Sequence, residues 1–167
     1  MTRVRIVAAA SLALAAAALA LGYGQDGRWA WSLAVLVATA VWVAGQWRRW
    51  PRIPDVGLPI LTGFAAVGVL LGLRAELMVL GLTGALCAWD LDRFLSRLEQ
   101  AGQVRDPRAL ADRHLGRLLS VAGLGLLLAL LALQMELRLT LWTALLLGLL
   151  AVLALGRTVR YLRRQSD

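Results

Sequence analysis

The chain has 167 residues, of which 60% are hydrophobic, and it carries a formal net charge of +8. Soluble domains are usually about half apolar or less. Here the excess is collected into long uncharged runs, which excludes an ordinary soluble domain and predicts a membrane-embedded one. All 18 basic residues are arginines that flank these runs, so we expect no nucleic-acid partner. The single cysteine, Cys87, excludes an intramolecular disulfide or a cysteine-rich zinc site.

The first two apolar runs predict two membrane-spanning helices, each of which needs about 20 residues. The first, 6–22, follows two arginines and contains Ala18-Leu19-Ala20, a pattern that also occurs in signal peptides. We expect a retained first helix. The second, 29–47, has tryptophans near both ends, as interfacial aromatic belts require. Two glycines and an aspartate between the runs indicate a tight turn.

The next two predicted spans are 57–73 and 77–90, separated by a short turn at 74–76. Pro59 fits the first turn of the earlier span, where a missing N–H costs little. The later span is short, but apolar residues continue beyond it at helical spacing. We therefore expect its helix to leave the membrane and end near Gln100.

The last two predicted spans are 117–133 and 139–156. Asp106-Pro107 reads as an N-cap followed by proline at the first helical position, so a new helix should begin there. The extensions of spans four and five then form a cytoplasmic helical hairpin over 91–116. The predicted fold is all-α: a polytopic membrane helix bundle of six transmembrane helices arranged as three hairpins.

The distribution of arginines predicts the orientation. With six spans, every arginine except Arg28, Arg74 and Arg138 falls on one side. The positive-inside rule puts that side, with both termini, in the cytoplasm. We therefore expect a multi-pass protein of the cell inner (plasma) membrane, with the bilayer as its first partner. The arginines expected to anchor this topology are Arg48, Arg49, Arg52, Arg157, Arg160, Arg163 and Arg164.

A weak repeat relates residues 70–77 to residues 130–137, at a spacing of 60. Its informative matches are Glu76 with Glu136, and Thr83 with Thr143. Both copies would cross the membrane in the same direction, which would make them parallel repeats. Coincidence in a leucine-rich chain remains the alternative interpretation.

One polar cluster could carry chemistry, and it consists of Cys87, Asp90, Asp92 and His114. An Asp-x-Asp pair can hold a divalent cation together with phosphate oxygens. However, residues two apart on a helix do not share a face, and no second carboxylate cluster is present. We interpret both aspartates as partners of Arg93, Arg97 or a facing helix. A metal site formed by the whole cluster is the alternative, and it requires the two cytoplasmic extensions to pack together.

The span interiors contain no ionisable group near their centres, and the chain contains no zinc-protease, nucleophile-elbow or phosphate-loop motif. We therefore assign no catalytic residue, cofactor or metal. The leading hypothesis is a structural, accessory or assembly protein that acts through helix packing, with other membrane subunits or with itself, and through the cytoplasmic hairpin. The alternatives are a small-molecule or lipid transporter, and an enzyme acting on phosphorylated lipid at the Asp90/Asp92 pair. Glycines expected to allow close helix packing are Gly63, Gly68, Gly72, Gly81, Gly84, Gly123 and Gly125.

Overall fold

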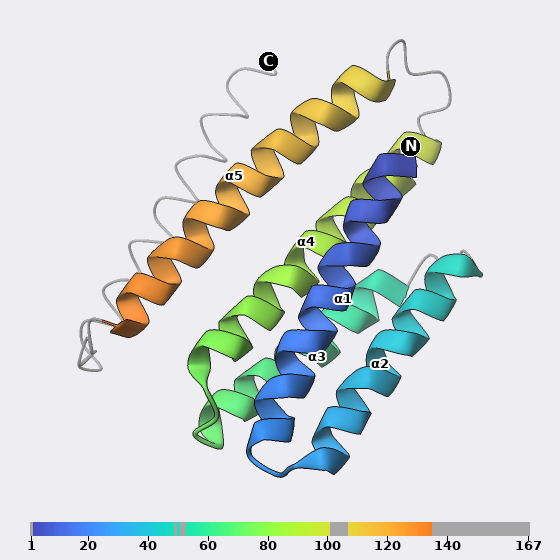
Figure 1. Cartoon of the computed structure of the whole chain (residues 1–167). Coiled ribbons are helices and arrows are strands. Elements are labelled where there is room, and N and C mark those ends of the chain that lie inside the picture. The colour runs from blue at the N-terminus through green and yellow to red at the C-terminus, as the bar shows by residue number, and fades with distance from the viewer. Residues whose placement is uncertain (1, 49, 51–52, 101–106, 135–167) are drawn as a thin grey trace, which may run out of the picture. The chain divides into compact units, whose positions relative to one another are not determined.

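The computed structural model describes residues 2–48, 50, 53–100 and 107–134, and the regular structure in this part of the chain is entirely α-helical (Figure 1). The predicted all-α class is confirmed. The predicted sixth span, 139–156, lies outside the described residues. The helices are α1 (Thr2–Gln25), α2 (Trp29–Trp47), α3 (Ile53–Leu70), α4 (Ala75–Gln100) and α5 (Pro107–Gln134).

Four of these helices, α1, α2, α3 and α5, are long and apolar enough to cross a membrane. α4, which contains the predicted fourth span, is not among them. Its apolar stretch is bounded by Glu76 on one side and by Asp90, Asp92 and Arg93 on the other. The described residues therefore supply four candidate spans, and α4 is a more polar helix packed among them.

The bounds of α2 and the far end of α4 agree with the sequence prediction, but the position of α3 does not. We expected a span over 57–73, whereas α3 begins at Ile53 and ends at Leu70. Asp55 lies in its first turn, where a carboxylate interacts favourably with the helix dipole. Pro59 consequently lies inside the helix rather than in its first turn.

Two glycines with positive φ angles end α1 and α3. Gly27 has φ 74° and Gly72 has φ 77°. After α1, the N–H of Arg28 reaches back to the carbonyl of Tyr23 at 3.0 Å, and after α3 the N–H of Leu73 makes the equivalent bond at 3.0 Å. This bond, spanning five residues around a left-handed residue, is the Schellman motif that satisfies carbonyls at a helix end. The turn after α3 therefore lies a few residues before the predicted 74–76.

α1 packs most extensively against α4, and the two helices run antiparallel (Figure 1). A Cβ added to Gly84 would lie 2.7 Å from the carbonyl oxygen of Ser11 and 3.2 Å from the Cβ of Ala15. One added to Gly81 would lie 2.6 Å from Cγ of Leu19. At Gly84 the two backbones approach so closely that glycine is needed, whereas at Gly81 the Leu19 side chain fills the space. Such close approaches at small residues are typical of helix contacts inside membranes.

The predicted packing glycines therefore divide into groups. Gly68 packs against Met78, and Gly81 and Gly84 pack against α1, while Gly72 forms a turn. A Cβ added at Gly63, Gly123 or Gly125 would meet no other described residue. The described residues therefore do not support a packing role for these three glycines.

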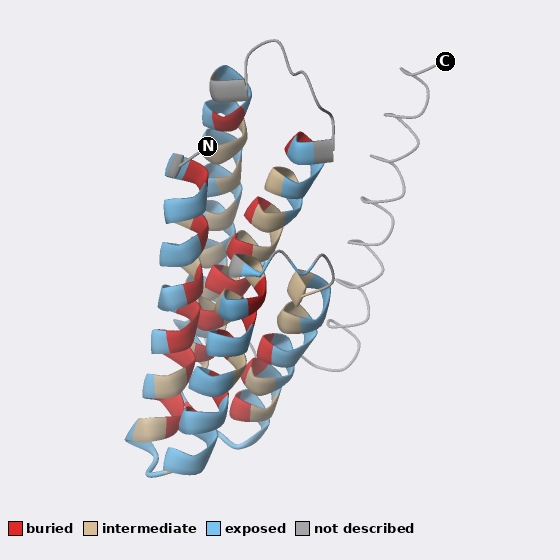
Figure 2. Cartoon of the chain, turned by 90° about the vertical axis from the view of Figure 1, so that its right-hand side faces the viewer, coloured by how far each residue is buried: buried red, intermediate tan, exposed pale blue. Residues whose placement is uncertain are grey.

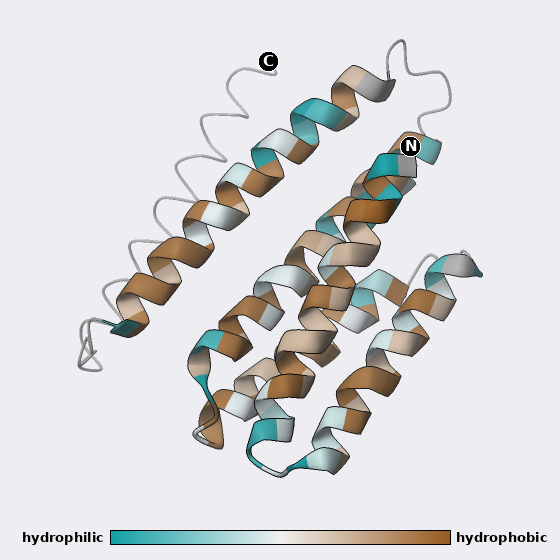
Figure 3. Cartoon of the chain, viewed as in Figure 1, coloured by the Kyte–Doolittle hydropathy of each residue, from teal (hydrophilic) through white to brown (hydrophobic). Residues whose placement is uncertain are grey.

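Buried residues lie on the helix faces that turn toward one another (Figure 2). The main core joins α1, α2, α3 and α4 and includes Tyr23, Trp42 and Met78. A second cluster joins α1, α4 and α5 through Val4, Leu91 and Ala111, with other apolar side chains around them. Hydrophilic residues gather at helix ends and turns (Figure 3). This distribution leaves apolar surfaces along the middle of the helices, as a lipid environment requires.

Candidate functional site

The second half of α4 makes at least one polar contact with each of the other four described helices. The contacts lie toward the N-terminal ends of α1, α3 and α5 and the C-terminal ends of α2 and α4; we call this the basic end. We call the set of contacts the polar hub. Its α4 members are Trp89, Asp90, Asp92, Arg93 and Glu99, and its members on other helices are Arg5, Trp42, Gln46, Asp55 and His114.

Asp92 connects α4 to α2. Its Oδ2 atom accepts hydrogen bonds from Nε1–H of Trp42, at 3.1 Å, and from the side-chain amide of Gln46. Trp42 and Gln46 are four residues apart, so they share one face of α2. Asp92 lies beyond the predicted span 77–90. Burial away from water disfavours the charged carboxylate and raises the pKa of Asp92, while the hydrogen bonds from Gln46 and Trp42 act in the opposite direction.

Asp90 connects α4 to α5. Its Oδ2 atom lies 2.8 Å from Nε2 of His114, and both side chains remain partly exposed. The imidazole stacks on the ring of Phe94, with the ring centroids 4.2 Å apart and the planes 4° from parallel. His114 is therefore held between a carboxylate and an aromatic face of the same helix, which fixes the first turns of α5 against α4.

Two further contacts complete the hub. Asp55 of α3 accepts hydrogen bonds from Arg93, at 2.6 Å, and from Nε1–H of Trp89, at 3.3 Å. The Arg93 guanidinium also lies 4.7 Å from the centroid of the Trp89 ring, a cation–π contact. Arg5 of α1 donates to Glu99 at 3.1 Å in an exposed ion pair. Each of the helices around α4 thus has its own polar link to it.

The four residues of the predicted cluster do not converge on one point. Asp90 and His114 meet, Asp92 faces α2 instead, and half-buried Cys87 makes no hydrogen bond within the described part of the chain. No group of three or more potential metal ligands occurs among the described residues. The aspartates pair with facing helices rather than with Arg93 or Arg97. The Oδ2 atom of each aspartate contacts a side chain of another helix, which is the arrangement of a structural network.

Sequence reasoning missed the donors that Asp92 uses and the partner that Arg93 uses. Trp42 was interpreted as part of an interfacial aromatic belt, yet it is 1% exposed. Its spacing from Gln46 was a usable signal, because two donors on one helix face suit a carboxylate. The sequence could not indicate which helix would supply that carboxylate, since α2 and α4 are not consecutive.

Of the predicted topology anchors, only Arg48 lies in the described residues, where it is exposed at the end of α2. Arg49, Arg52, Arg157, Arg160, Arg163 and Arg164 lie outside them.

The fold and the hub together define an all-helical protein with candidate membrane spans, held at one end by interhelical polar contacts. No protein-family model, curated protein or solved structure matches the chain.

Proposed function

We propose that the chain is a membrane protein of structural, accessory or assembly type, which acts by packing its helices against other membrane subunits or a second copy. The observation that carries this proposal is the contrast between α5 and the other candidate spans. In the most apolar 18-residue stretch, 39% of residues are buried in α1, 28% in α2 and 17% in α3, but 0% in α5. Only the first turns of α5 contribute to a described core cluster.

The exposed surface of α5 is large and apolar. Leu119, Val121, Leu124, Leu127 and Leu128 are all more than half exposed. Lipid tails can cover such a surface, but a Cβ added at its Gly116, Gly123 or Gly125 would meet no other described residue, which suits the approach of a second helix. Because Asp90 and Asp92 contact different helices and do not converge, the hydrolytic or transfer chemistry of the enzyme alternative has less support than helix packing.

The finer topology belongs to the same proposal. We propose six spans in three hairpins, with both termini in the cytoplasm of a cell with an inner membrane. This topology would place the basic end and the 91–116 hairpin on the cytoplasmic side. The antiparallel runs of α1 with α2 and of α1 with α4 support this alternation.

Cysteine cross-linking tests the proposal directly. Cys87 is the only cysteine, so Cys87→Ser gives a background in which any disulfide must be intermolecular. Leu124→Cys places a thiol on the exposed surface of α5, where Leu124 is 62% exposed, and Leu33→Cys on α2 is the matched control at 63%. We expect oxidation in native membranes to give a discrete covalent adduct, with a second copy or another membrane protein, from Leu124→Cys and not from Leu33→Cys.

Absence of an adduct at Leu124 and at neighbouring exposed positions of α5, such as Leu128, would contradict the proposal. So would a protein that purifies in mild detergent as a lone monomer without any partner. Equal adduct formation at Leu33 would indicate random collision in the membrane and would also count against a specific surface on α5.

A further inference from the structure

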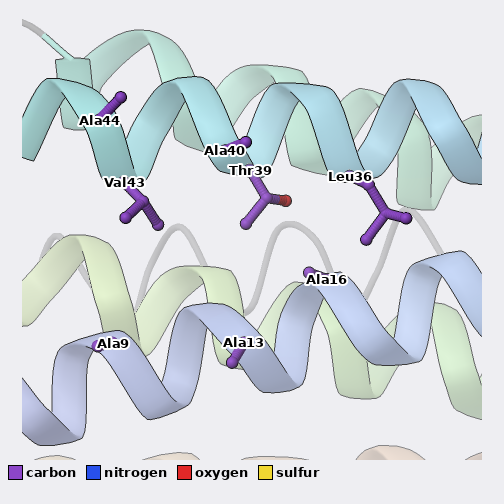
Figure 4. A pocket seen from close by; sticks show the side chains of 8 residues that line it. All are labelled: Ala9, Ala13, Ala16, Leu36, Thr39, Ala40, Val43 and Ala44. Atoms are coloured by element: carbon purple, nitrogen blue, oxygen red, sulfur yellow. The ribbon is translucent and has the colours of Figure 1, made fainter.

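An open apolar groove of about 380 Å³ lies between α1 and α2 (Figure 4). Small side chains line it on both sides. Ala9 lies across from Ala44, Ala13 across from Ala40, and Ala16 toward Leu36. Because the helices are antiparallel, the numbers of facing residues add to 52 or 53 at each level. The groove therefore has a fixed register along both helices.

The register places two arginines at one mouth of the groove. Arg5 is four residues before Ala9 and Arg48 is four residues after Ala44, so each continues a lining face by one turn. Their numbers add to 53, which puts them level with each other at the basic end. Arg48 still follows the helical path, since its N–H bonds to the carbonyl of Ala44 at 3.0 Å.

Both arginines are accessible to a ligand. The side chain of Arg5 is 58% exposed although it pairs with Glu99. Arg48 is exposed and has no acidic partner among residues 2–48, 50, 53–100 and 107–134. One turn beyond the groove lining, the two arginines thus carry positive charge that the described helices neutralise only in part, and this charge favours an anion.

A hydrogen bond joins the two helices beyond the opposite end of the groove. The hydroxyl of Ser32 donates to the carbonyl of Ala20 at 2.8 Å, which draws α1 and α2 together there. At 1.5 Å per residue, the lining from Leu36 to Ala44 is about 12 Å long. One leaflet of the hydrocarbon core is about 15 Å thick, half of the whole. The groove therefore matches a chain confined to one leaflet and is too short for a helix that crosses the bilayer.

We propose that the groove between α1 and α2 holds one acyl chain of an anionic phospholipid, whose phosphate is bound by Arg5 and Arg48. The alanines give the chain a smooth surface to lie against, and the two guanidinium groups provide the donors that phosphate oxygens accept. The site selects lipids by headgroup charge at the mouth, and its length suits an acyl chain in one leaflet. It requires only that α1 and α2 lie in a bilayer, and it does not depend on the proposed partner surface of α5.

Native mass spectrometry of the purified full chain tests the site, with equal amounts of phosphatidylglycerol and phosphatidylcholine of matched acyl chains. We expect one phosphatidylglycerol to bind in preference to phosphatidylcholine. An arginine near an anionic lipid contributes about 1 kcal/mol, so Arg48→Gln should lower that preference about fivefold. Ala13→Leu with Ala40→Leu should fill the groove and abolish binding of both lipids at that site.

Matched controls lie on the same helices or at the same end. Ala10→Leu changes an exposed residue of α1 outside the groove lining, and Arg97→Gln removes an exposed arginine of the basic end on α4. Both should bind lipid as the wild type does. Equal binding of the two lipids by the wild type would overturn the proposal, as would unchanged binding by Arg48→Gln. A change of oligomeric state in the groove variants would identify a second copy as the occupant and would overturn it as well.

Discussion

Replacing Gly84 by alanine should weaken the contact between α1 and α4. The new Cβ would lie 2.7 Å from the carbonyl oxygen of Ser11 and 3.1 Å from the backbone nitrogen of Ala15. Carbon and oxygen atoms usually approach no closer than about 3.3 Å, so the helices must separate by about 0.6 Å. These neighbours are backbone atoms, which cannot rotate away. Overpacking of this kind costs about 1–3 kcal/mol.

The matched control is Gly63→Ala, because an added Cβ there meets open space within the described residues. Alanine favours a helix over glycine by up to about 1 kcal/mol at either position. That gain cancels when the two variants are compared, and the difference of about 1–3 kcal/mol measures the clash alone. The free energy of unfolding can be followed by far-ultraviolet circular dichroism during denaturation in mixed micelles. Equal stability of the two variants would refute the close contact deduced from the structure.

Three further predictions concern the turns and the hub. Gly72→Ala should lower the free energy of unfolding by about 1 kcal/mol, since alanine disfavours a positive φ, whereas Gly72→Asn should lose less; thermal denaturation distinguishes them. Asp92→Ala should lower the free energy of unfolding by about 1–3 kcal/mol, because the indole N–H of Trp42 loses its acceptor. NMR should then detect faster hydrogen exchange of that N–H. The pKa of Asp92 is raised in the folded state. The contribution of Asp92 to stability is therefore present below the unfolded pKa of 3.8 and decreases as pH rises through the folded pKa. An identical pH dependence of stability in Asp92→Asn would contradict this assignment.

The sequence indicated helices well where a single local signal dominated. The tryptophans that bound α2 and the Asp106-Pro107 start signal gave helix bounds that agree with the structure. The predicted span 57–73 begins too late because it places Pro59 in the first turn, whereas Asp55 lies in the first turn of α3 and the left-handed Gly72 follows its end. Local signals compete in such segments, and the stronger one is not evident from the residues alone.

The partners in the polar hub could not be predicted for a different reason. Every link in it joins residues at least 24 positions apart, and the link between Asp92 and Trp42 spans 50. Helical periodicity identifies which face of a helix is apolar, but it does not determine which other helix that face meets. The choice depends on how all the helices pack together, with close approaches such as Gly84 against α1 fixing the neighbours of α4.

The polar hub also limits the order in which the protein can be assembled. Chains fold from the N-terminus as they are synthesised, so Arg5, Trp42 and Asp55 are already made when α4 emerges. Charged residues lie in the second half of α4, and their partners on three earlier helices are available by then. Asp90 alone must wait, because His114 belongs to α5. Its bond to His114 is therefore the last link of the hub to close, and it forms only after α4 and α5 have both been made.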